Sequence, residues 1–225
     1  HITLGAWFKD YIFYPISLSK PLKKLTVKGR KHLGNHFGPL LAGSCALFAV
    51  WICNGLWHGA EWKYIFFGMY YFALIILANI TAPLSKKVLE ILHINKNHPV
   101  YHVWQIIRTV FLVNIGELFF RANGLRAGFA MLKKIFTEFS FATFSDGTLL
   151  KLGLDIHDFI IVIATLVLVL AVSICHEKNI CLREKISGIN IFARWTIYYA
   201  AILFVVIFGA YGVGYAPINM IYAGF

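Results

Sequence analysis

The sequence has 225 residues, of which 59% are hydrophobic and 14% are charged, and its mean hydropathy is +0.70. A water-soluble domain typically carries about 25% charged residues, so this composition excludes an ordinary soluble domain and predicts an integral membrane protein. The net charge of +11 does not indicate a nucleic-acid-binding protein, because the positive charges gather in short segments between apolar runs, as in the cytoplasmic loops of membrane proteins.

The chain opens with a short amphipathic segment. Leu4, Trp7, Phe8 and Tyr11 are spaced i, i+3, i+4 and i+7, which places them on one face of a helix. Pro15 is expected to end this helix, because proline lacks a backbone N–H and its ring crowds the preceding turn. Such a helix suits either the headgroup plane of a membrane or the surface of a helical bundle.

Five apolar runs further along the chain are long enough to cross the hydrocarbon core of a bilayer, which takes about 20 helical residues. The runs are continuous rather than alternating, which favours helices over a closed barrel because helices satisfy their own backbone. We therefore predict an all-α, polytopic transmembrane helical bundle with interfacial amphipathic helices. The spans are expected at 39–57, 64–82, 103–120, 159–175 and 195–213.

The basic residues suggest an orientation for these spans. If the predicted loop at 20–36 is cytoplasmic, 14 of the 21 Lys and Arg residues lie on the cytoplasmic side and six lie on the opposite side. This bias agrees with the positive-inside rule. In this topology His58 lies at or near the outer end of its helix.

A second amphipathic segment is predicted between the third and fourth spans. Arg126, Lys133 and Lys134 lie on one side of this segment, opposite an apolar stripe. As with the first segment, the headgroup plane and the surface of the bundle are both suitable environments. The stripe comprises Leu125, Gly128, Phe129, Leu132, Ile135 and Phe136.

The densest group of polar and small residues follows the first span. His58 stands between Gly55 and Gly59, with Asn54 and Trp57 close by in the sequence. Imidazole titrates near neutral pH, which suits it to proton transfer, and two glycines at i, i+4 leave room for a second backbone or a substrate. The alternative is an ordinary helix end whose aromatic residues anchor it at the membrane surface.

Several segments together resemble one family. The opening HITLGAWFKDY at 1–11, followed by Pro15, resembles the signature His-x-[Ser/Thr]-Leu-x-x-Trp-[Phe/Leu]-[Arg/Lys]-Asp-Tyr of the membrane-bound O-acyltransferases. GLWHGA at 55–60 is similar to the second signature of that family, which carries its catalytic histidine. FFRA at 119–122 and the closing IYAGF at 221–225 are similar to segments of the alginate O-acetyltransferase branch.

This resemblance implies a function for the two histidines. Members of the family move an acyl group from a thioester to a hydroxyl, so His58 would be the general base and His1 a second active-site histidine that orients one reactant. The chain would be the carboxy-terminal part, residues 1–225, of one membrane domain of this type. The family also contains a D-alanyl-lipoteichoic acid transferase branch.

The resemblance also sets expectations for the surroundings of the reaction. The thioester donor would be acetyl-CoA or an acyl-carrier protein, with no tightly bound cofactor and no metal. The acceptor would be a hydroxyl of a cell-surface or exported polymer. Membrane lipid surrounds the protein, the location would be the bacterial cytoplasmic membrane, and an extracytoplasmic acyltransferase-like or esterase-like protein is an expected partner. A transporter or a non-catalytic membrane scaffold is the competing interpretation.

Four further residues are candidates for binding or positioning a substrate. Asn54, one turn before His58, would hold the imidazole tautomer or polarise the thioester carbonyl, unless it is a helix-packing amide. Trp57 would flank the base. Asp10 would position the first helix, unless it is a solvated carboxylate. Arg108, inside a span, would either contact the phosphates of the donor or pair with Glu117, because an unpaired guanidinium is costly there.

Overall fold

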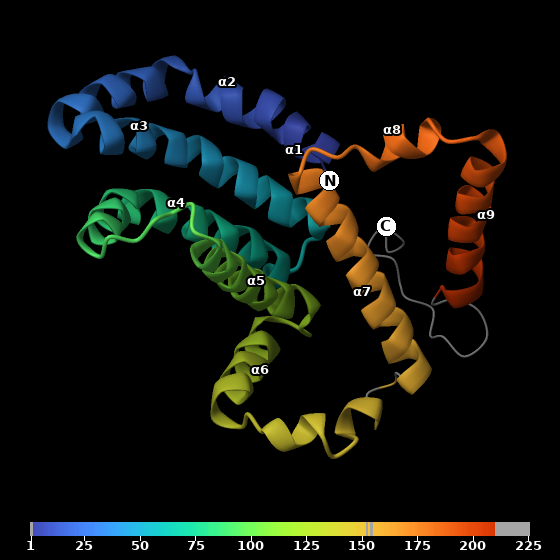
Figure 1. The fold of residues 1–225 in the computed structure, drawn as a ribbon. Coiled ribbons are helices and arrows are strands. Elements are labelled where there is room, and N and C mark those ends of the chain that lie inside the picture. Colours follow the sequence, from blue (N-terminus) through green and yellow to red (C-terminus); the bar gives the residue numbers. More distant parts are fainter. Residues whose placement is uncertain (1, 152, 154, 210–225) are drawn as a thin grey trace. The chain divides into compact units, whose positions relative to one another are not determined.

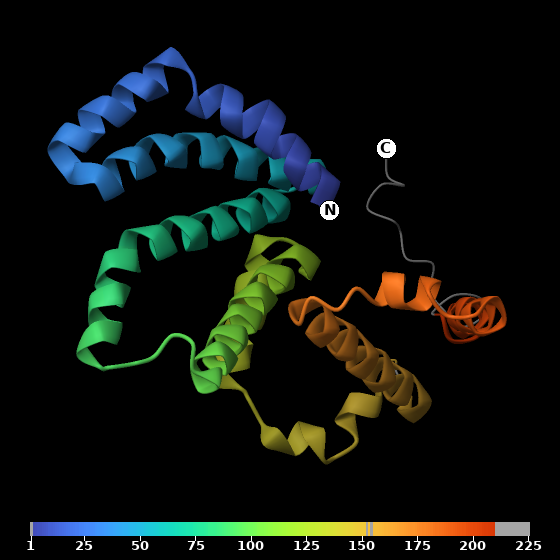
Figure 2. The same cartoon turned by 45° about the horizontal axis from the view of Figure 1, so that its top comes forward.

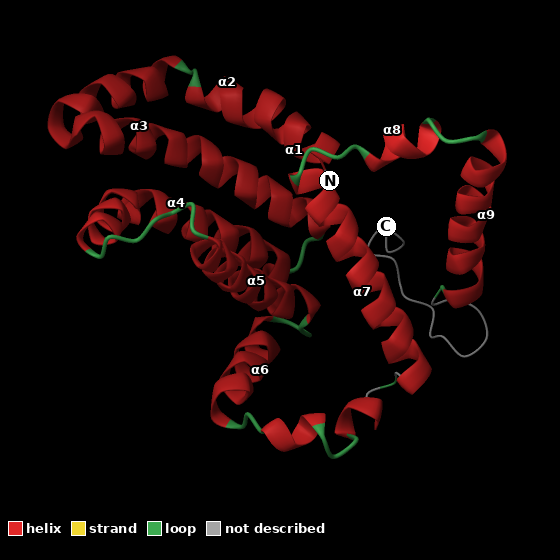
Figure 3. Ribbon diagram, in the orientation of Figure 1, coloured by secondary structure: helices red, strands yellow, loops and turns green. Residues whose placement is uncertain are grey.

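The computed structural model describes residues 2–151, 153 and 155–209, and these residues form helices, turns and loops without a β-strand (Figures 1 and 3). The predicted all-α fold is therefore confirmed. Among the described residues, five helices are long and apolar enough to cross a membrane, so the chain has the architecture of a multi-pass membrane protein. They are α3 (Lys20–His58), α4 (Trp62–Ile91), α5 (Pro99–Arg121), α7 (Ile156–Glu177) and α9 (Ile191–Phe208).

Each predicted span coincides with one of these helices, although residues 210–213 of the last span lie outside the described residues. The closing segment at 221–225 lies outside them as well. The chain divides into two compact units, His1–Phe139 and Ser140–Phe225, which we describe separately. The expectation of one membrane domain over 1–225 stays a prediction.

The chain begins with α1 (Ile2–Phe8), the π-helical turn η1 (Lys9–Phe13) and α2 (Tyr14–Ser17). The prediction that Pro15 ends the helix is wrong, since the backbone stays helical to Ser17. A π turn is wider than an α turn, and here the N–H of Tyr14 bonds the carbonyl of Lys9. The wider turn relieves the crowding that proline causes in an α-helix.

The predicted loop at 20–36 is also wrong, because α3 is helical from Lys20 onward. Gly34 has φ 78° and ψ −178°, a conformation that favours glycine, and it separates α3 into two helical halves. The halves fold back on each other, since a Cβ on Gly29 would lie 3.0 Å from Cα of Gly38. Figure 1 shows this reversal at the left-hand end of α3.

The second half of α3, α4 and α5 form an antiparallel arrangement joined by short connections. The imidazole Nε2 of His36 lies 2.9 Å from the carbonyl oxygen of Asn79, which ties the start of this half to α4. The hydroxyl of Tyr70 on α4 donates to the carbonyl of Leu112 on α5 at 2.9 Å. Beyond the predicted span, α4 bends near Pro83 (Figure 2), as expected of a proline inside a helix.

The second amphipathic segment forms α6 (Leu125–Thr137). Its amino-terminal half packs against the helices, because Gly128 is buried and a Cβ there would lie 2.6 Å from the ring of Phe119. Phe129 packs on Phe119 with ring centroids 4.9 Å apart. Further along the stripe Leu132 is half-buried and Ile135 and Phe136 are exposed, and Phe129 is itself 52% exposed. The packing alternative therefore holds for the first half of α6.

The second unit contains two 3-10 turns, η2 (Phe141–Phe144) and η3 (Thr148–Lys151), and the helices α7, α8 (Leu182–Ser187) and α9. Asp155 caps α7, because its carboxylate accepts a hydrogen bond from the N–H of Asp158 at 2.9 Å. The carboxylate of Asp158 in turn accepts one from the N–H of Asp155 at 3.1 Å. No residue of α7 or of α9 is buried. Helices that are apolar on all sides and uncovered are typical of membrane spans.

Candidate active site

The predicted base, His58, is the last residue of α3, and a turn of three residues leads from it to α4. Gly59 caps the helix with φ 149°, and its N–H bonds the carbonyl of Leu56 at 3.1 Å. Because only glycine adopts this φ readily, Gly59 serves the sharp turn. The space that was expected beside Gly59 is instead occupied by Tyr64, whose ring lies 2.7 Å from where a Cβ would stand.

Two glycines bring the backbones of α3 and α4 together near His58. A Cβ on Gly55 would lie 2.5 Å from the carbonyl oxygen of Tyr64, and a Cβ on Gly68 would strike the carbonyl oxygen of Trp51. Both glycines are buried. Small residues at such positions let membrane helices approach closely. The contact fixes the last turns of α3 against the first turns of α4.

Aromatic rings from two other helical segments surround the imidazole. The ring centroid of His58 lies 5.0 Å from that of Phe120, at an interplanar angle of 89°, and 5.8 Å from that of Phe67, at 85°. The ring centroid of Tyr64 lies 6.5 Å from that of His58. The ring centroid of Phe120 lies 5.1 Å from those of Tyr64 and Phe67. We call Tyr64, Phe67 and Phe120 the aromatic wall.

The two ring nitrogens of His58 have different environments. Nδ1 is buried and has no hydrogen-bond partner among the described residues, and it is the one buried side-chain nitrogen or oxygen in them of which this is true. A buried polar atom normally has a partner, so Nδ1 is unusual among the described residues. Nε2 is not buried in this way, so it is the ring nitrogen that a substrate could reach.

Of the other predicted site residues, Trp57 contacts His58, whereas Arg108 lies elsewhere. Trp57 lies against His58 with ring centroids 4.6 Å apart. Asn54 lies one turn earlier on α3 and makes no hydrogen bond to Nδ1 of the imidazole. No contact therefore supports the prediction that Asn54 holds the imidazole in one tautomer. Arg108 lies on α5, where it lines a separate cavity. His1 lies outside the described residues.

The segment that follows His1 nevertheless begins near the end of α3 that carries His58. η1 and α2 pack against α3, and Figures 1 and 2 both show the start of α1 beside the last turns of α3. Asp10 is exposed on η1 and has no ion pair among the described residues. The two signature segments, which are separated in the sequence, are therefore neighbours in the fold.

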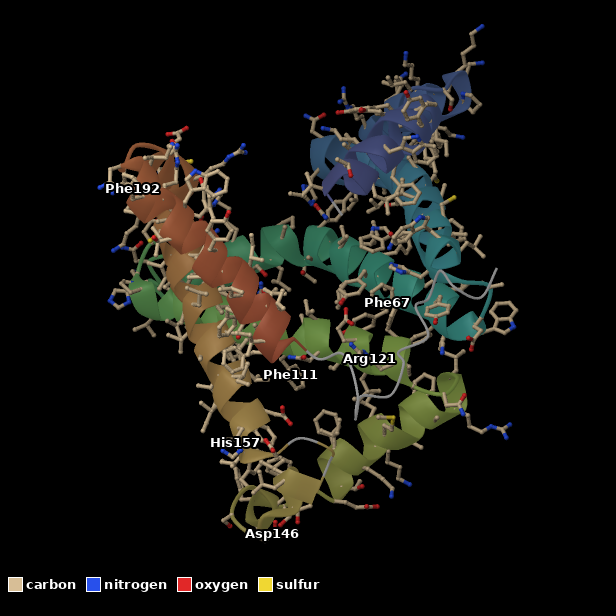
Figure 4. All side chains as sticks on the ribbon, turned by 90° about the vertical axis from the view of Figure 1, so that its right-hand side faces the viewer. Phe67, Phe111, Arg121, Asp146, His157 and Phe192 are labelled. Atoms are coloured by element: carbon tan, nitrogen blue, oxygen red, sulfur yellow. The ribbon has the colours of Figure 1, made fainter. Side chains whose placement is uncertain are left out.

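The aromatic wall was not predicted from the sequence as part of the site. The signal in the sequence that points to it is the FFRA segment at 119–122, whose resemblance to the family does not by itself give it a place in the site. In the structure Phe119 and Ala122 are each 2% exposed. They anchor the end of α5, and Phe120 between them turns to His58. Phe67 on α4 and Arg121, the residue after Phe120 on α5, can be followed in Figure 4.

Replacement of Phe120 by alanine tests whether the aromatic wall positions the imidazole. If it does, Phe120→Ala lowers the rate of the reaction that depends on His58 by about tenfold to a hundredfold, because small displacements of a reacting group are costly. Phe111→Ala is the matched control, since Phe111 is an exposed residue earlier on the same helix (Figure 4). Equal rates for the two variants would mean that the wall has no positioning role.

Three curated proteins are similar in sequence to this chain. A probable alginate O-acetylase of Pseudomonas aeruginosa is 26% identical over 137 residues, which cover 61% of this chain and 21% of that protein. A peptidoglycan O-acetyltransferase of Helicobacter pylori is 26% identical over 133 residues, covering 59% and 20%. A teichoic acid D-alanyltransferase of Bacillus subtilis is 29% identical over 87 residues, covering 39% and 20%.

The chain spans about a fifth of the length of these relatives. No protein-family profile matches the chain, and no solved structure matches it either.

Proposed function

Since the chain is a relative of the membrane-bound O-acyltransferases, we propose that the full-length protein is a membrane O-acyltransferase. It moves an acetyl group from a thioester donor to a hydroxyl of a cell-surface or exported polymer. The names of the relatives give alginate, peptidoglycan and teichoic acid as the molecules they modify. All three are polymers that bear hydroxyl groups, so we propose a hydroxyl-bearing polymer as the acceptor of this protein.

The observation that carries this proposal is the setting of His58. One nitrogen of its ring is buried, the other is not buried in this way, and aromatic side chains hold the ring on several sides. A fixed imidazole with one free nitrogen can act as a general base. The surrounding apolar rings limit the access of water, which would otherwise compete with the polymer hydroxyl for the thioester.

The reaction needs one proton to move twice. Nε2 of His58 accepts the proton of the acceptor hydroxyl as its oxygen attacks the thioester carbonyl carbon, and a C–O bond forms. The resulting tetrahedral intermediate collapses, the C–S bond breaks, and the leaving sulfur takes the proton back from the imidazolium. The products are an ester and a free thiol, so no metal or redox step is required. Asn54 is the candidate side chain for polarising the carbonyl.

The remaining participants are those that the family resemblance implies, and they are part of the proposal. The donor is acetyl-CoA or an acyl-carrier protein, and His1 orients one of the two reactants. The protein resides in the bacterial cytoplasmic membrane, and an extracytoplasmic acyltransferase-like or esterase-like protein is its expected partner. Asp10 and Trp57 support the geometry around His58.

The proposal is tested with the full-length protein in vesicles that contain a thioester labelled in its acetyl group and a hydroxylated polymer. The expected result is label in an alkali-sensitive ester on the polymer, with one thiol released for each ester formed. Movement of the thioester or of the polymer across the vesicle membrane, without ester formation, would instead identify a transporter. Neither transfer nor movement is the result expected of a scaffold.

A further inference from the structure

A cavity lies in the first unit, away from the candidate active site. Its volume is about 810 Å³, and it lies between the last turns of α4, the loop that follows and the first turns of α5. This volume is within the range of about 300–1,000 Å³ typical of small-molecule sites. No acidic residue lines it, and Arg108 is its one lining residue with a permanent charge. The polar lining residues are Ser85, His93, Asn95, His98, Tyr101 and Arg108.

Arg108 needs an anionic partner. It lies nine residues after Pro99, about 14 Å along α5 at 1.5 Å per residue, within a helix suited to span the membrane. It forms no ion pair or side-chain hydrogen bond with a described residue, and the pairing with Glu117 that was one of two predictions is not formed. An unpaired guanidinium at membrane depth is unfavourable.

The residues that line the cavity show which parts of it are polar and which are apolar. Tyr101, Trp104 and Arg108 are spaced i, i+3 and i+7 on α5 and all line it, so they share one face. Tyrosine and tryptophan gather at the level of lipid headgroups, and arginine side chains extend toward that level. The facing wall from α4, with Leu84 and Val88, is apolar. The cavity is therefore cationic at one end and apolar along its side.

We propose that this cavity binds an anionic phospholipid. The phosphate lies against the guanidinium of Arg108, which can donate two parallel hydrogen bonds to it, and Tyr101 and Trp104, nearer the start of α5, contact the polar headgroup. The acyl chains follow the apolar wall of Leu84 and Val88. Basic pockets between membrane helices on the cytoplasmic side are known to hold such headgroups.

The phosphates of a soluble thioester donor fit this cavity less well. Leu84 lies 22 residues after Trp62, which is about 33 Å of helix and close to the thickness of a hydrocarbon core, about 30 Å. His58 stands at the other end of α4. A donor whose phosphates were held by Arg108 would thus keep its thioester far from the base, whereas a lipid has no need to reach it.

The test measures lipids bound to the purified full-length protein by native mass spectrometry. Phosphatidylglycerol and phosphatidylcholine are added in equal amounts, and the expected result is a preference for phosphatidylglycerol of about fivefold, the effect of one basic residue on an anionic lipid. Arg108→Gln should remove this preference. Arg126→Gln, which changes an exposed arginine of α6 outside the cavity, should leave it unchanged.

Three results would overturn the proposal. The first is equal binding of the two lipids to the unaltered protein, a comparison that needs no variant to fold. The second is an unchanged preference in Arg108→Gln. The third is displacement of phosphatidylglycerol by millimolar coenzyme A or inorganic phosphate, which would assign the cavity to a soluble anion. None of these measurements depends on acyl transfer, so they stand apart from the role of His58.

Discussion

Replacing His58 by alanine in the full-length protein is expected to lower the rate of acyl transfer by about 10²- to 10⁴-fold, the usual contribution of a general base. The loss arises because the acceptor hydroxyl must then give up its proton without a base held beside it. Insertion into the membrane should be unaffected, since the ring makes no hydrogen bond to the rest of the described chain. The measurement is ester formed on the polymer at equal amounts of inserted protein.

Two controls separate loss of the base from a general disturbance. His102→Ala removes an exposed histidine of α5 and should retain full activity. Imidazole added to His58→Ala should restore part of the rate, because the small molecule can enter the space left by the side chain. Full activity of His58→Ala would show that this residue is not the base, even if the protein proved to be an acyltransferase.

The number and approximate position of the membrane helices could be predicted because the hydrocarbon core imposes a minimum length of apolar sequence. The ends of those helices could not. A helix satisfies its own backbone hydrogen bonds in water as well as in lipid, so it can continue into polar sequence, and the fall in hydropathy does not mark its end. This is why 20–36 is helical although its composition predicted a loop, and why α4 extends from the predicted 64–82 to Trp62–Ile91.

Local backbone geometry was the harder problem. The sequence around the reversal in α3 contains Gly29, Gly34 and Gly38, and nothing in the spacing distinguishes the one that turns the chain from the two that pack. In the structure Gly34 has the positive φ and the other two form the contact. Similarly, Pro15 predicts the end of a helix unless a wider turn precedes it, and the π turn is a property of the packed segment.

The candidate base could be predicted because a histidine between two glycines at the end of an apolar helix is chemically unusual. Its neighbours could not be. Phe67 follows His58 closely in the sequence, yet Phe120 belongs to the next helix, and only the packing of α5 on α4 brings them together. Gly55 and Gly59 were expected to play the same part. The structure divides them, with Gly55 at the helix contact and Gly59 in the turn.

Replacing Gly68 by alanine is expected to destabilise the protein by about 1–3 kcal/mol, the usual cost of overpacking. The added Cβ would meet the backbone carbonyl of Trp51, and backbone cannot rotate away as a side chain can. The helices α3 and α4 must then separate where Gly55 and Gly68 face each other. The measurement is the midpoint of thermal unfolding of the detergent-solubilised full-length protein, together with its rate of acyl transfer.

Gly43→Ala is the matched control for this prediction. Gly43 lies on the same half of α3, and a Cβ there would meet nothing within 4 Å. Alanine favours a helix over glycine by about 1 kcal/mol, so this variant should be as stable as the unaltered protein or more so. Because the helix contact also sets the position of His58 beside Phe67, Gly68→Ala should lose activity at temperatures below its unfolding transition, where Gly43→Ala keeps it. If both variants melted alike and worked alike, the close approach of α3 and α4 would not be what holds the imidazole in place.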